Sequence, residues 1–310
     1  MIEVVDLQKY ERDYCHYYSG RSGVKYPVII NGERWMIKFP RTSSRFSEVN
    51  NQLLPNITNP LREYIGSHIY EALEIPVHET ILGYREDKIV VACKDFDPMR
   101  AMVPYRNIRN SITEETAALS KLHSNSGELL SDVLTVLDTV PALKNNPSIT
   151  QRFWDMFVVD AFIRNNNRDN NNWGFFIDED SIATPAPVFD NGDAFSSEEN
   201  SDITRGHLKE DVSMRQDSYG IGISFFLGDN GSHINPFDYI ESAANPDCTD
   251  ALIRFMDRIE LDEVCRIIDD IPEYAFDLEV IQPAVRQHYK TMLLLTYTKR
   301  LVPILDKMSK

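Results

Sequence analysis

The sequence predicts an α+β fold in two lobes, a strand-rich N-terminal lobe followed by a helical C-terminal lobe. Up to about residue 97, apolar residues form short runs rich in Val, Ile and aromatic side chains, separated by turn signals. From about residue 111, they recur at helical spacing in longer segments. We therefore expect an N-terminal lobe over residues 1–97 and a C-terminal lobe over residues 98–310.

Four strands and one helix are expected in the N-terminal lobe. Asn31-Gly32 separates the runs VII and WMIKF, a pattern typical of a hairpin with a two-residue turn. The segments PVHETILGY and DKIVVACKDF predict two further strands joined by a turn. Between these pairs, the apolar residues of PLREYIGSHIYEALEI recur at helical spacing, which predicts a helix.

The C-terminal lobe is expected to begin with three helices, over SITEETAALSKLHS, GELLSDVLTVLDTV and ITQRFWDMFVVDAFI. Ser111 and Glu114 have the spacing of a capping box, so the first of these helices is expected to begin at Ser111. The polar segment from Asp193 to Asp217 predicts a solvated loop. The chain beyond it reads as amphipathic helix.

The composition is that of a globular protein with excess acid. The 310 residues are 42% hydrophobic and carry a formal net charge of −16, which disfavours non-specific binding to nucleic acid. Four cysteines without a CxxC pair predict neither a disulfide framework nor a zinc site, so we expect a reducing compartment. The N-terminus lacks the features of an ordinary signal peptide, and no apolar stretch approaches the ~20 residues of a membrane span. We expect a soluble protein.

Three features of the N-terminal lobe could serve a phosphate-binding site. The loop SGRSGVK contains Gly20 and Gly23, which would let backbone N–H groups approach a phosphate but could equally serve plain turns. Lys38 lies between two apolar residues of a strand, so it either reaches a buried partner or faces solvent. Glu63 could face that lysine, or be a first-turn acid favoured by the helix dipole.

Two candidate metal ligands follow the third helix of the C-terminal lobe. Asn172 ends a run of Asn, Arg and Asp directly before WGFF, and Asp190 begins DNG after PVF. An amide and a carboxylate from two adjacent segments supply hard oxygen atoms, the ligands that Mg²⁺ prefers. The alternative is a surface loop and a turn, because Asn, Asp and Gly are common turn residues.

Taken in order, these features resemble the HipA-like family of bacterial serine/threonine kinases, in particular its compact members of the HipT and CtkA types. The resemblance covers roughly residues 17–195 and rests on WMIKFP, LREYIGSHIYEALEIPVHET, VACKDFD, FIRNNNRDNNNWGF and PVFDNG. It implies a bilobal protein-kinase-like fold that uses ATP and Mg²⁺.

The resemblance also implies roles for residues of the N-terminal lobe. Lys38 would hold the α- and β-phosphates of ATP, with Glu63 as its ion-pair partner. Lys94 and Phe96 would form the hinge whose backbone meets the adenine.

The Gly/Ser loop would cover the phosphates through Gly20, Ser22 and Gly23. In several relatives this loop is autophosphorylated, which makes Ser22, and after it Ser19, the expected sites. A phosphate there would add negative charge where ATP binds and could switch the enzyme off.

In the C-terminal lobe, the resemblance makes Asn172 and Asp190 the Mg²⁺ ligands, but one position departs from the family pattern N-x-D-R-x-x-x-N. Asn167 stands where the catalytic Asp is expected, followed by Arg168 as the pattern requires. An amide cannot accept the proton of a substrate hydroxyl, and loss of a general base typically lowers the rate by ~10²–10⁴. Asp169 is two residues further on, which would move its carboxylate away from the hydroxyl.

We therefore expect an ATP- and Mg²⁺-dependent serine/threonine kinase of HipA-like toxin or effector type, disabled by Asn167. Because the other machinery is intact, an active kinase whose Asp was exchanged for Asn is favoured over a natural pseudokinase that binds nucleotide and acts as an interaction module. A third alternative, a phosphohydrolase using Asp190 and Asp169, would need further acids or histidines that the sequence does not offer at suitable spacing.

The family also implies partners and a location. The expected substrate is a protein, with an aminoacyl-tRNA synthetase or a host-cell protein as candidates. The sequence shows no DNA-binding motif, so a repressor or antitoxin would be a separate protein. We expect no direct contact with nucleic acid or membrane, and a location in the bacterial cytoplasm or export without an ordinary signal peptide.

Overall fold

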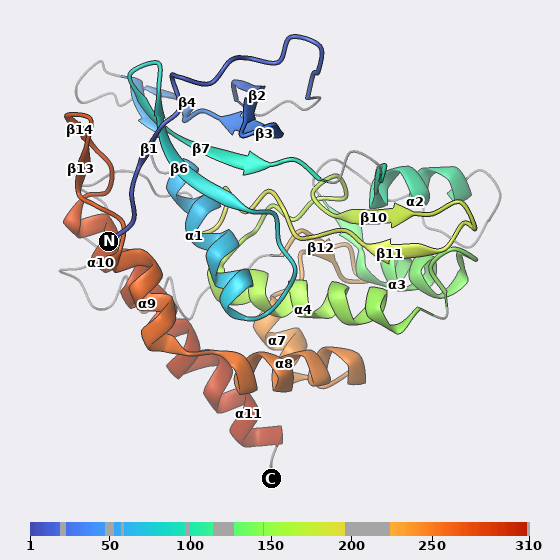
Figure 1. The fold of residues 1–310 in the computed structure, drawn as a ribbon. Coiled ribbons are helices and arrows are strands. Elements are labelled where there is room, and N and C mark those ends of the chain that lie inside the picture. Colours follow the sequence, from blue (N-terminus) through green and yellow to red (C-terminus); the bar gives the residue numbers. More distant parts are fainter. Residues whose placement is uncertain are drawn as a thin grey trace.

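A five-stranded sheet with the strand order β1-β6-β7-β3-β2 forms the first part of the fold, seen at the top of Figure 1. The computed structural model describes residues 1–18, 23–46, 53–56, 59–96, 100–113, 127–144, 146–195 and 224–308. Strand β1 runs parallel to β6, and the other neighbours are antiparallel. The sheet consists of β1 (Val5–Asp6), β2 (Lys25–Ile30), β3 (Glu33–Lys38), β6 (Thr80–Arg85) and β7 (Lys88–Lys94).

Both predicted hairpins are confirmed. Asn31 and Gly32 have φ angles of 52° and 84°, the positive values that a two-residue type I′ turn requires. This turn sets the register of β2 against β3, from Ile30 opposite Glu33 to Lys25 opposite Lys38. The tight turn therefore places Lys38 at the far end of β3.

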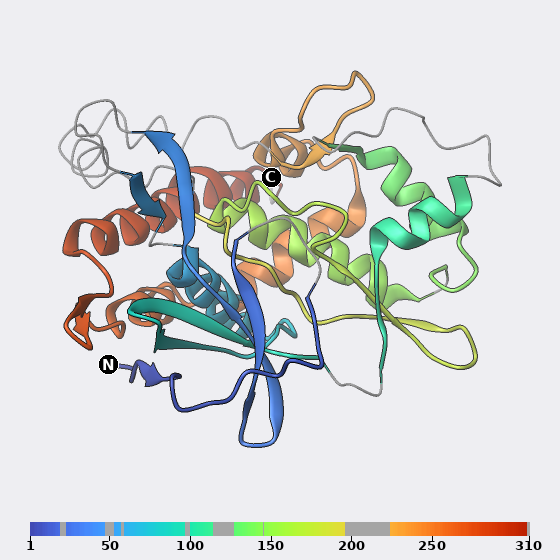
Figure 2. The same ribbon diagram turned by 90° about the horizontal axis from the view of Figure 1, so that it is seen from above.

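Helix α1 (Asn59–Ala72) packs between the sheet and the helical part of the fold, as the views from the side and from above show (Figures 1 and 2). It contacts β6 and β7 on one side and α9 (Leu261–Asp269) on the other. Eleven of its fourteen residues are buried, so its surface is covered on nearly every side. Any polar side chain on α1 must therefore find a partner inside the protein.

Helices dominate the remainder of the chain, as predicted. Alongside them, a small antiparallel sheet has the order β11-β10-β8. The further helices are α2 (Tyr105–Thr113), α3 (Leu130–Thr139), α4 (Pro147–Ile163), α7 (Pro236–Glu241), α8 (Pro246–Arg258), α10 (Pro283–Thr296), the π-helix η1 (Tyr297–Leu301) and α11 (Val302–Met308). The other strands are β4 (Arg41–Phe46), β5 (Leu53–Asn56), β8 (Met102–Pro104), β9 (Glu128–Leu129), β10 (Gly174–Ile177), β11 (Ala183–Pro185), β12 (Phe226–Leu227), β13 (Tyr274–Ala275) and β14 (Leu278–Glu279).

Helix α4 is the central helix of this part and ends where the Asn-rich loop begins. Asn146 caps its start by accepting a hydrogen bond from the Ser148 N–H at 3.2 Å. Twelve of its seventeen residues are buried. Arg164 ends it in the left-handed conformation, with a φ of 56°, and turns the chain into the Asn-rich loop.

The prediction that a helix begins at Ser111 is wrong. Helix α2 begins at Tyr105, and Ser111 lies in its last turn, where its hydroxyl donates to the Ile108 carbonyl at 2.7 Å. Tertiary contacts fix the start instead, because the Tyr105 N–H donates to the Trp173 carbonyl and the two rings stack at 4.3 Å. Glu114 lies outside the described residues.

The N-terminus is tied to the helical part of the fold. The Met1 ammonium pairs with the Asp270 carboxylate at 2.5 Å, and the Ile2 N–H donates to the Asp270 carbonyl.

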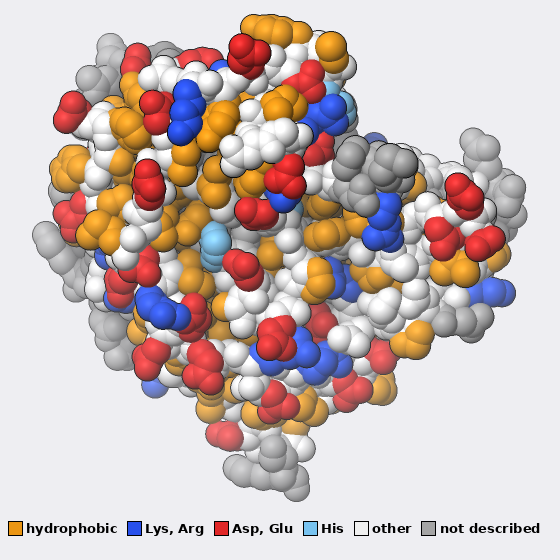
Figure 3. Space-filling view, in the orientation of Figure 1, with side chains coloured by type: hydrophobic (Ala, Val, Ile, Leu, Met, Phe, Trp, Pro, Cys, Tyr) orange, Lys and Arg blue, Asp and Glu red, His pale blue; other side chains and the backbone are white. Residues whose placement is uncertain are grey.

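The predicted lobe boundary falls at residues 97–99, outside the described residues, and stays a prediction. Across the described ranges, no helix combines the length and the apolar character that crossing a membrane requires. Acidic side chains are scattered over the face of the molecule shown in Figure 3.

Gly174→Ala should destabilise the fold by about 1–3 kcal/mol, because the small sheet leaves no room for a methyl group. A Cβ at position 174 would collide with the Val103 carbonyl oxygen and lie 2.9 Å from the Pro104 Cα, both backbone atoms of β8. Gly228→Ala is the matched control, since its nearest neighbour is the Asn230 side chain at 3.3 Å. Urea denaturation measures both; equal stability losses would show that β8 can move away freely.

Candidate active site

One ammonium group joins two carboxylates that come from distant parts of the chain. Lys38 Nζ, at the end of β3, lies 2.7 Å from Glu63 Oε2 of α1 and 2.9 Å from Asp190 Oδ1. The Lys38 side chain is 14% exposed and that of Glu63 is 1% exposed. The alternative that Lys38 faces solvent is therefore wrong, and the structure brings together three of the predicted site residues.

This group consists of charges that stabilise one another inside the protein. Burial alone would lower the pKa of Lys38, but the carboxylates of Asp190 and Glu63 outweigh it and raise the pKa above its ordinary value. Burial would likewise raise the pKa of Glu63, but the Lys38 ammonium and the hydrogen bond from His78 hold it well below its usual range. We therefore expect Lys38 and Glu63 to be charged throughout the physiological pH range.

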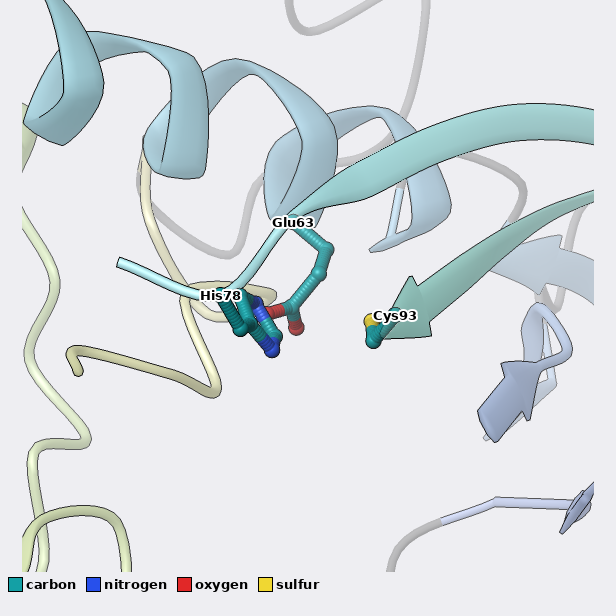
Figure 4. Close-up of side chains that lie close together, drawn as sticks. All are labelled: Glu63, His78 and Cys93. Carbon is teal, nitrogen blue, oxygen red and sulfur yellow. The ribbon is translucent and has the colours of Figure 1, made fainter. Parts of the chain in front are cut away.

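Glu63 is held from a second side, as Figure 4 shows for His78. His78 Nε2 lies 3.0 Å from Glu63 Oε1, and the Asn191 backbone N–H donates to the same oxygen at 2.9 Å. Glu63 is the fifth residue of α1, and the first turn contains no acid, so the alternative of a first-turn dipole acid is wrong. Its role in the structure is to position Lys38 and the segment that follows Asp190.

Cys93 completes a buried group with Glu63 and His78, whose potential ligand atoms all lie within 4.8 Å of one another. Two observations argue against a resident metal there. Burial raises the pKa of the Cys93 thiol, which disfavours the thiolate that binds metals. In addition, Lys38, His78 and the Asn191 N–H already occupy both oxygens of Glu63.

Arg168 connects the Asn-rich loop to the segment that carries Asp190. Its guanidinium donates to the two Asp160 oxygens at 2.8 and 2.9 Å and to Asn191 Oδ1 at 2.6 Å. It also donates to the carbonyls of Asn172 and Phe189. Burial would lower the pKa of Arg168, but Asp160 raises it above its ordinary value. One buried cation thus fixes the backbone beside both predicted metal ligands.

The DNG segment packs closely against α1 through two glycines. Asn59 Nδ2 donates to the Gly192 carbonyl at 2.6 Å, and a Cβ at Gly192 would lie 2.8 Å from that nitrogen. A Cβ at Gly66 would lie 2.8 Å from the Asn191 Cβ. Asp190 has a φ of 59°, a left-handed conformation that Asp tolerates better than most residues. This packing holds the Asp190 carboxylate beside Lys38.

Asn167, at the predicted base position, and the predicted metal ligand Asn172 are neighbours in the Asn-rich loop. Asn172 Nδ2 donates to the Asn167 carbonyl at 2.8 Å, so the amide oxygen points away from that carbonyl. The Asn167 side chain donates through Nδ2 to Asp193 Oδ2 at 2.7 Å. Asp169 is bound within the loop, since it accepts from the Asn171 N–H at 2.6 Å.

The predicted hinge residues lie at the end of β7 and directly after it. The Lys94 N–H donates to the Glu79 carbonyl, so an adenine contact through this group would have to replace an existing hydrogen bond. The Lys94 ammonium pairs with Glu33 at 2.8 Å. The Phe96 ring packs edge-on against the ring of Phe189, with the centroids 5.5 Å apart. Phe189 is the residue directly before Asp190 in the sequence. Both roles remain predictions.

Most of the predicted Gly/Ser loop, with Ser19, Gly20 and Ser22, lies outside the described residues. Gly23 is described and has a φ of 72°, a conformation that favours glycine over residues with a Cβ. The plain-turn alternative therefore stays open for this loop.

Sequence reasoning missed several residues that complete the site. No sequence pattern marks His78, because it lies fifteen residues after Glu63. The two side chains meet only because α1 packs beside the segment that precedes β6. Asp160 lies in an apolar stretch of α4, and a single acid in such a helix does not by itself indicate a buried partner. Asp193 could have been found, since it is the next acid after Asp190 in DNGD.

Lys38→Met should lower the free energy of unfolding at neutral pH by about 3–5 kcal/mol, because it leaves the buried Glu63 carboxylate without its cation. In the unchanged chain the pKa of Glu63 is lowered by folding, so its stabilisation is present above about pH 4.3 and is lost as the pH falls. In the variant, the lowering effect of the Lys38 ammonium no longer opposes burial, so Glu63 takes up its proton at a higher pH than in the unchanged chain. The stability difference should therefore shrink between about pH 7.5 and about pH 4.5.

Urea denaturation at the two pH values measures this difference. Lys94→Met is the matched control in the same sheet, because its side chain is 33% exposed and pairs with surface acids. Its loss should be at most about 1 kcal/mol. A Lys38→Met loss that grows toward acid pH would contradict the charged pair.

Comparison with known proteins places this geometry in a family, although no family model matches the chain. The serine/threonine-protein kinase CtkA of Helicobacter pylori strain J99 is 33% identical over 259 residues, which cover 82% of this chain and 75% of CtkA. A crystal structure of the Helicobacter pylori proinflammatory kinase CtkA superposes with a TM-score of 0.85 at 28% identity. The match covers 98% of this chain and 97% of that one.

A more distant structure has the same fold. HipA of Shewanella oneidensis MR-1, in a complex with HipB and operator DNA, has a TM-score of 0.57 at 15% identity. The match covers 94% of this chain and 68% of that one. The predicted α+β kinase-like fold is confirmed. The motifs, the buried Lys38–Glu63 pair and the CtkA match agree, and the chain belongs to the HipA-like family of serine/threonine protein kinases.

Proposed function

We propose that this chain binds ATP with Mg²⁺ and transfers the γ-phosphoryl group to a serine or threonine of a protein, at a rate lowered by Asn167. The observation that carries the proposal is the contact of Lys38 with both Glu63 and Asp190. Phosphoryl transfer requires a positioned cation for the phosphates and an acid that binds the metal. Here both groups lie within hydrogen-bond distance of each other.

Lys38 and Glu63 are the phosphate-holding part of this proposal. The Lys38 ammonium neutralises phosphate charge, and Glu63 keeps it in place from a helix that is itself buried on nearly every side. The Lys38 ammonium also contacts Asp190. A phosphate oxygen would therefore bind on the side of the ammonium that faces Asp190.

The residues present fit Mg²⁺. Asp190 and Asn172 offer a carboxylate and an amide oxygen, the hard ligands that this ion prefers. The Asp190 side chain is 25% exposed, which leaves it accessible, and Arg168 holds the backbone beside both ligands. When bound, the ion would neutralise charge on the β- and γ-phosphates.

Asn167 is expected to slow chemistry without weakening nucleotide binding. Its amide can orient a hydroxyl but cannot take the proton, which costs ~10²–10⁴ in rate. It contacts neither Lys38 nor Glu63 among the interactions of the described residues. The alternative phosphohydrolase is not supported, because Asp169 is engaged with Asn171 inside its own loop.

A second candidate function follows from the same position. Since the amide replaces a base while Lys38, Glu63, Arg168 and Asp190 are all connected, the chain could bind nucleotide as a pseudokinase that acts as an interaction module.

The partners follow from the family. We propose a protein substrate, with an aminoacyl-tRNA synthetase or a host-cell protein as candidates. HipA was crystallised with HipB and operator DNA, which supports a separate antitoxin protein as a further partner of this chain.

Asn167→Asp should raise phosphotransfer by ~10²–10⁴, because it restores a carboxylate at the base position. Transfer of labelled phosphate from ATP with Mg²⁺ to dephosphorylated casein measures the gain. If both proteins transfer no phosphate but ATP raises their melting temperature, the pseudokinase function is correct. If the unchanged chain is already as fast as the variant, position 167 is not the base position.

Asp190→Asn should abolish the Mg²⁺-dependent part of the rise in melting temperature that ATP causes, because an amide is a weaker ligand than a carboxylate. Asn also tolerates the φ of 59° at this position, so the backbone should survive the change. Asp180→Asn, an exposed acid in the turn between β10 and β11, is the control and should retain the full rise. Equal rises in the two variants would show that Asp190 holds no metal.

We also propose that the active form autophosphorylates in the Gly/Ser loop, at Ser22 and after it Ser19. Incubation of Asn167→Asp with ATP and Mg²⁺, followed by mass spectrometry, should find phosphate on the peptide that contains both serines. Ser22→Ala should remove most of it, and activity should then no longer decline during incubation. Phosphate confined to other peptides would overturn this assignment.

A further inference from the structure

Three acids lie in the two loops that meet at Asn167, the amide at the predicted base position: Asp169, Asp190 and Asp193. Asp190 contacts Lys38, and Asp169 accepts hydrogen bonds from Asn171 within its own loop. The Asp193 carboxylate accepts a hydrogen bond from the Asn167 side chain itself, with Oδ2 2.7 Å from Asn167 Nδ2. Asp193 therefore places a carboxylate one hydrogen bond away from the side chain where the family has its base.

The backbone on both sides of this contact is fixed independently of it. On the Asp193 side, the Ala194 N–H donates to the Asn191 carbonyl at 3.0 Å, and the Phe195 N–H donates to the Ile163 carbonyl at 2.8 Å. The second bond ties the segment to the last residue of α4, from which the Asn-rich loop starts.

On the Asn167 side, the Asn172 amide donates to the Asn167 carbonyl at 2.8 Å, and the next residue, Arg168, is anchored in the core by its buried side chain. The Asn167 and Asp193 side chains thus meet because the fold brings their two loops together.

We propose that Asp193 is the proton acceptor for the phosphotransfer that this chain retains, and that Asn167 is a positioning residue that orients its carboxylate. This inference rests on the proposed kinase function. In the step, the hydroxyl oxygen of the substrate forms a bond to the γ-phosphorus, and the bond from that phosphorus to the β–γ bridging oxygen breaks. The hydroxyl proton passes to the Asp193 carboxylate and later to water, and ADP leaves.

The geometry also explains why this route is slow. The Asp193 Oδ2 atom lies 2.7 Å from the Asn167 amide nitrogen, so it does not occupy the position from which a carboxylate at residue 167 would act. A misplacement of ~1 Å can cost ~10² in rate, so Asp193 should recover only part of the rate that a correctly placed base provides.

The same contact predicts opposite effects of one substitution in two backgrounds. In the unchanged chain, Asp193→Asn removes the proton acceptor while its amide oxygen can still accept from Asn167. In Asn167→Asp, the two positions would carry carboxylates about a hydrogen bond apart, which disfavours two charges. There, Asp193→Asn relieves the repulsion, and the new amide can donate to Asp at position 167.

The experiment measures four proteins: the unchanged chain, Asp193→Asn, Asn167→Asp and the double variant. Transfer of labelled phosphate from ATP with Mg²⁺ to dephosphorylated casein is followed over hours, and the ATP-induced rise in melting temperature is recorded alongside. We expect Asp193→Asn alone to lower residual transfer by at least ~10-fold at an unchanged melting-temperature rise. In the Asn167→Asp background, the same change should leave transfer equal or higher. Asp180→Asn, exposed and outside the site, should change neither quantity.

The outcomes separate this inference from the function on which it rests. No transfer by any of the four proteins overturns the kinase function. Transfer by Asn167→Asp with none by the unchanged chain overturns only the role of Asp193. The role of Asp193 is also overturned if Asp193→Asn leaves the residual phosphotransfer unchanged, or if it lowers phosphotransfer equally in both backgrounds. A loss accompanied by a smaller ATP-induced rise would assign Asp193 to nucleotide binding, and would also overturn its role as the proton acceptor.

Discussion

The buried guanidinium of Arg168 is the interaction on which the site depends. It neutralises Asp160 inside the protein and holds the backbone carbonyls of Asn172 and Phe189, one from each of the two loops. A buried cation is tolerated only when its donors are satisfied, and here the partners come from three segments of the chain. Loss of any one segment would leave buried N–H donors of this guanidinium without acceptors, so the two loops are fixed together.

A second buried charge group, formed by Lys38 and Glu63, connects the sheet to the helical part. Helix α1 carries Glu63 and is covered on nearly every side, so the Glu63 carboxylate has no access to water and requires Lys38, His78 and the Asn191 N–H. Because Asn191 also accepts from Arg168, the two charge groups share one residue. The site is therefore one continuous polar network in which the positions proposed to bind phosphate, to bind metal and to carry the base depend on each other.

Much of this site could be predicted from local sequence. The Asn31-Gly32 turn and the strand pattern around it place Lys38 at a strand end, and the Asn-rich run with DNG marks the two loops. The partners of these residues could not be predicted, because His78, Asp160 and Asp193 meet them through packing rather than through spacing. The start of α2 was missed for the same reason, since a contact with Trp173 overrides the capping signal at Ser111.

The sequence by itself determined the α+β class, the order of the hairpins and the helices, the family and the presence of an amide at position 167. These features depend on periodicity, turn chemistry and local motifs, which one stretch of chain can encode. Only the tertiary structure decided that Glu63 is a partner of Lys38 rather than a dipole acid, and that Asn167 donates to Asp193. Both contacts join residues that are brought together by the burial of apolar faces, and the distance between two such side chains is a property of the packed fold.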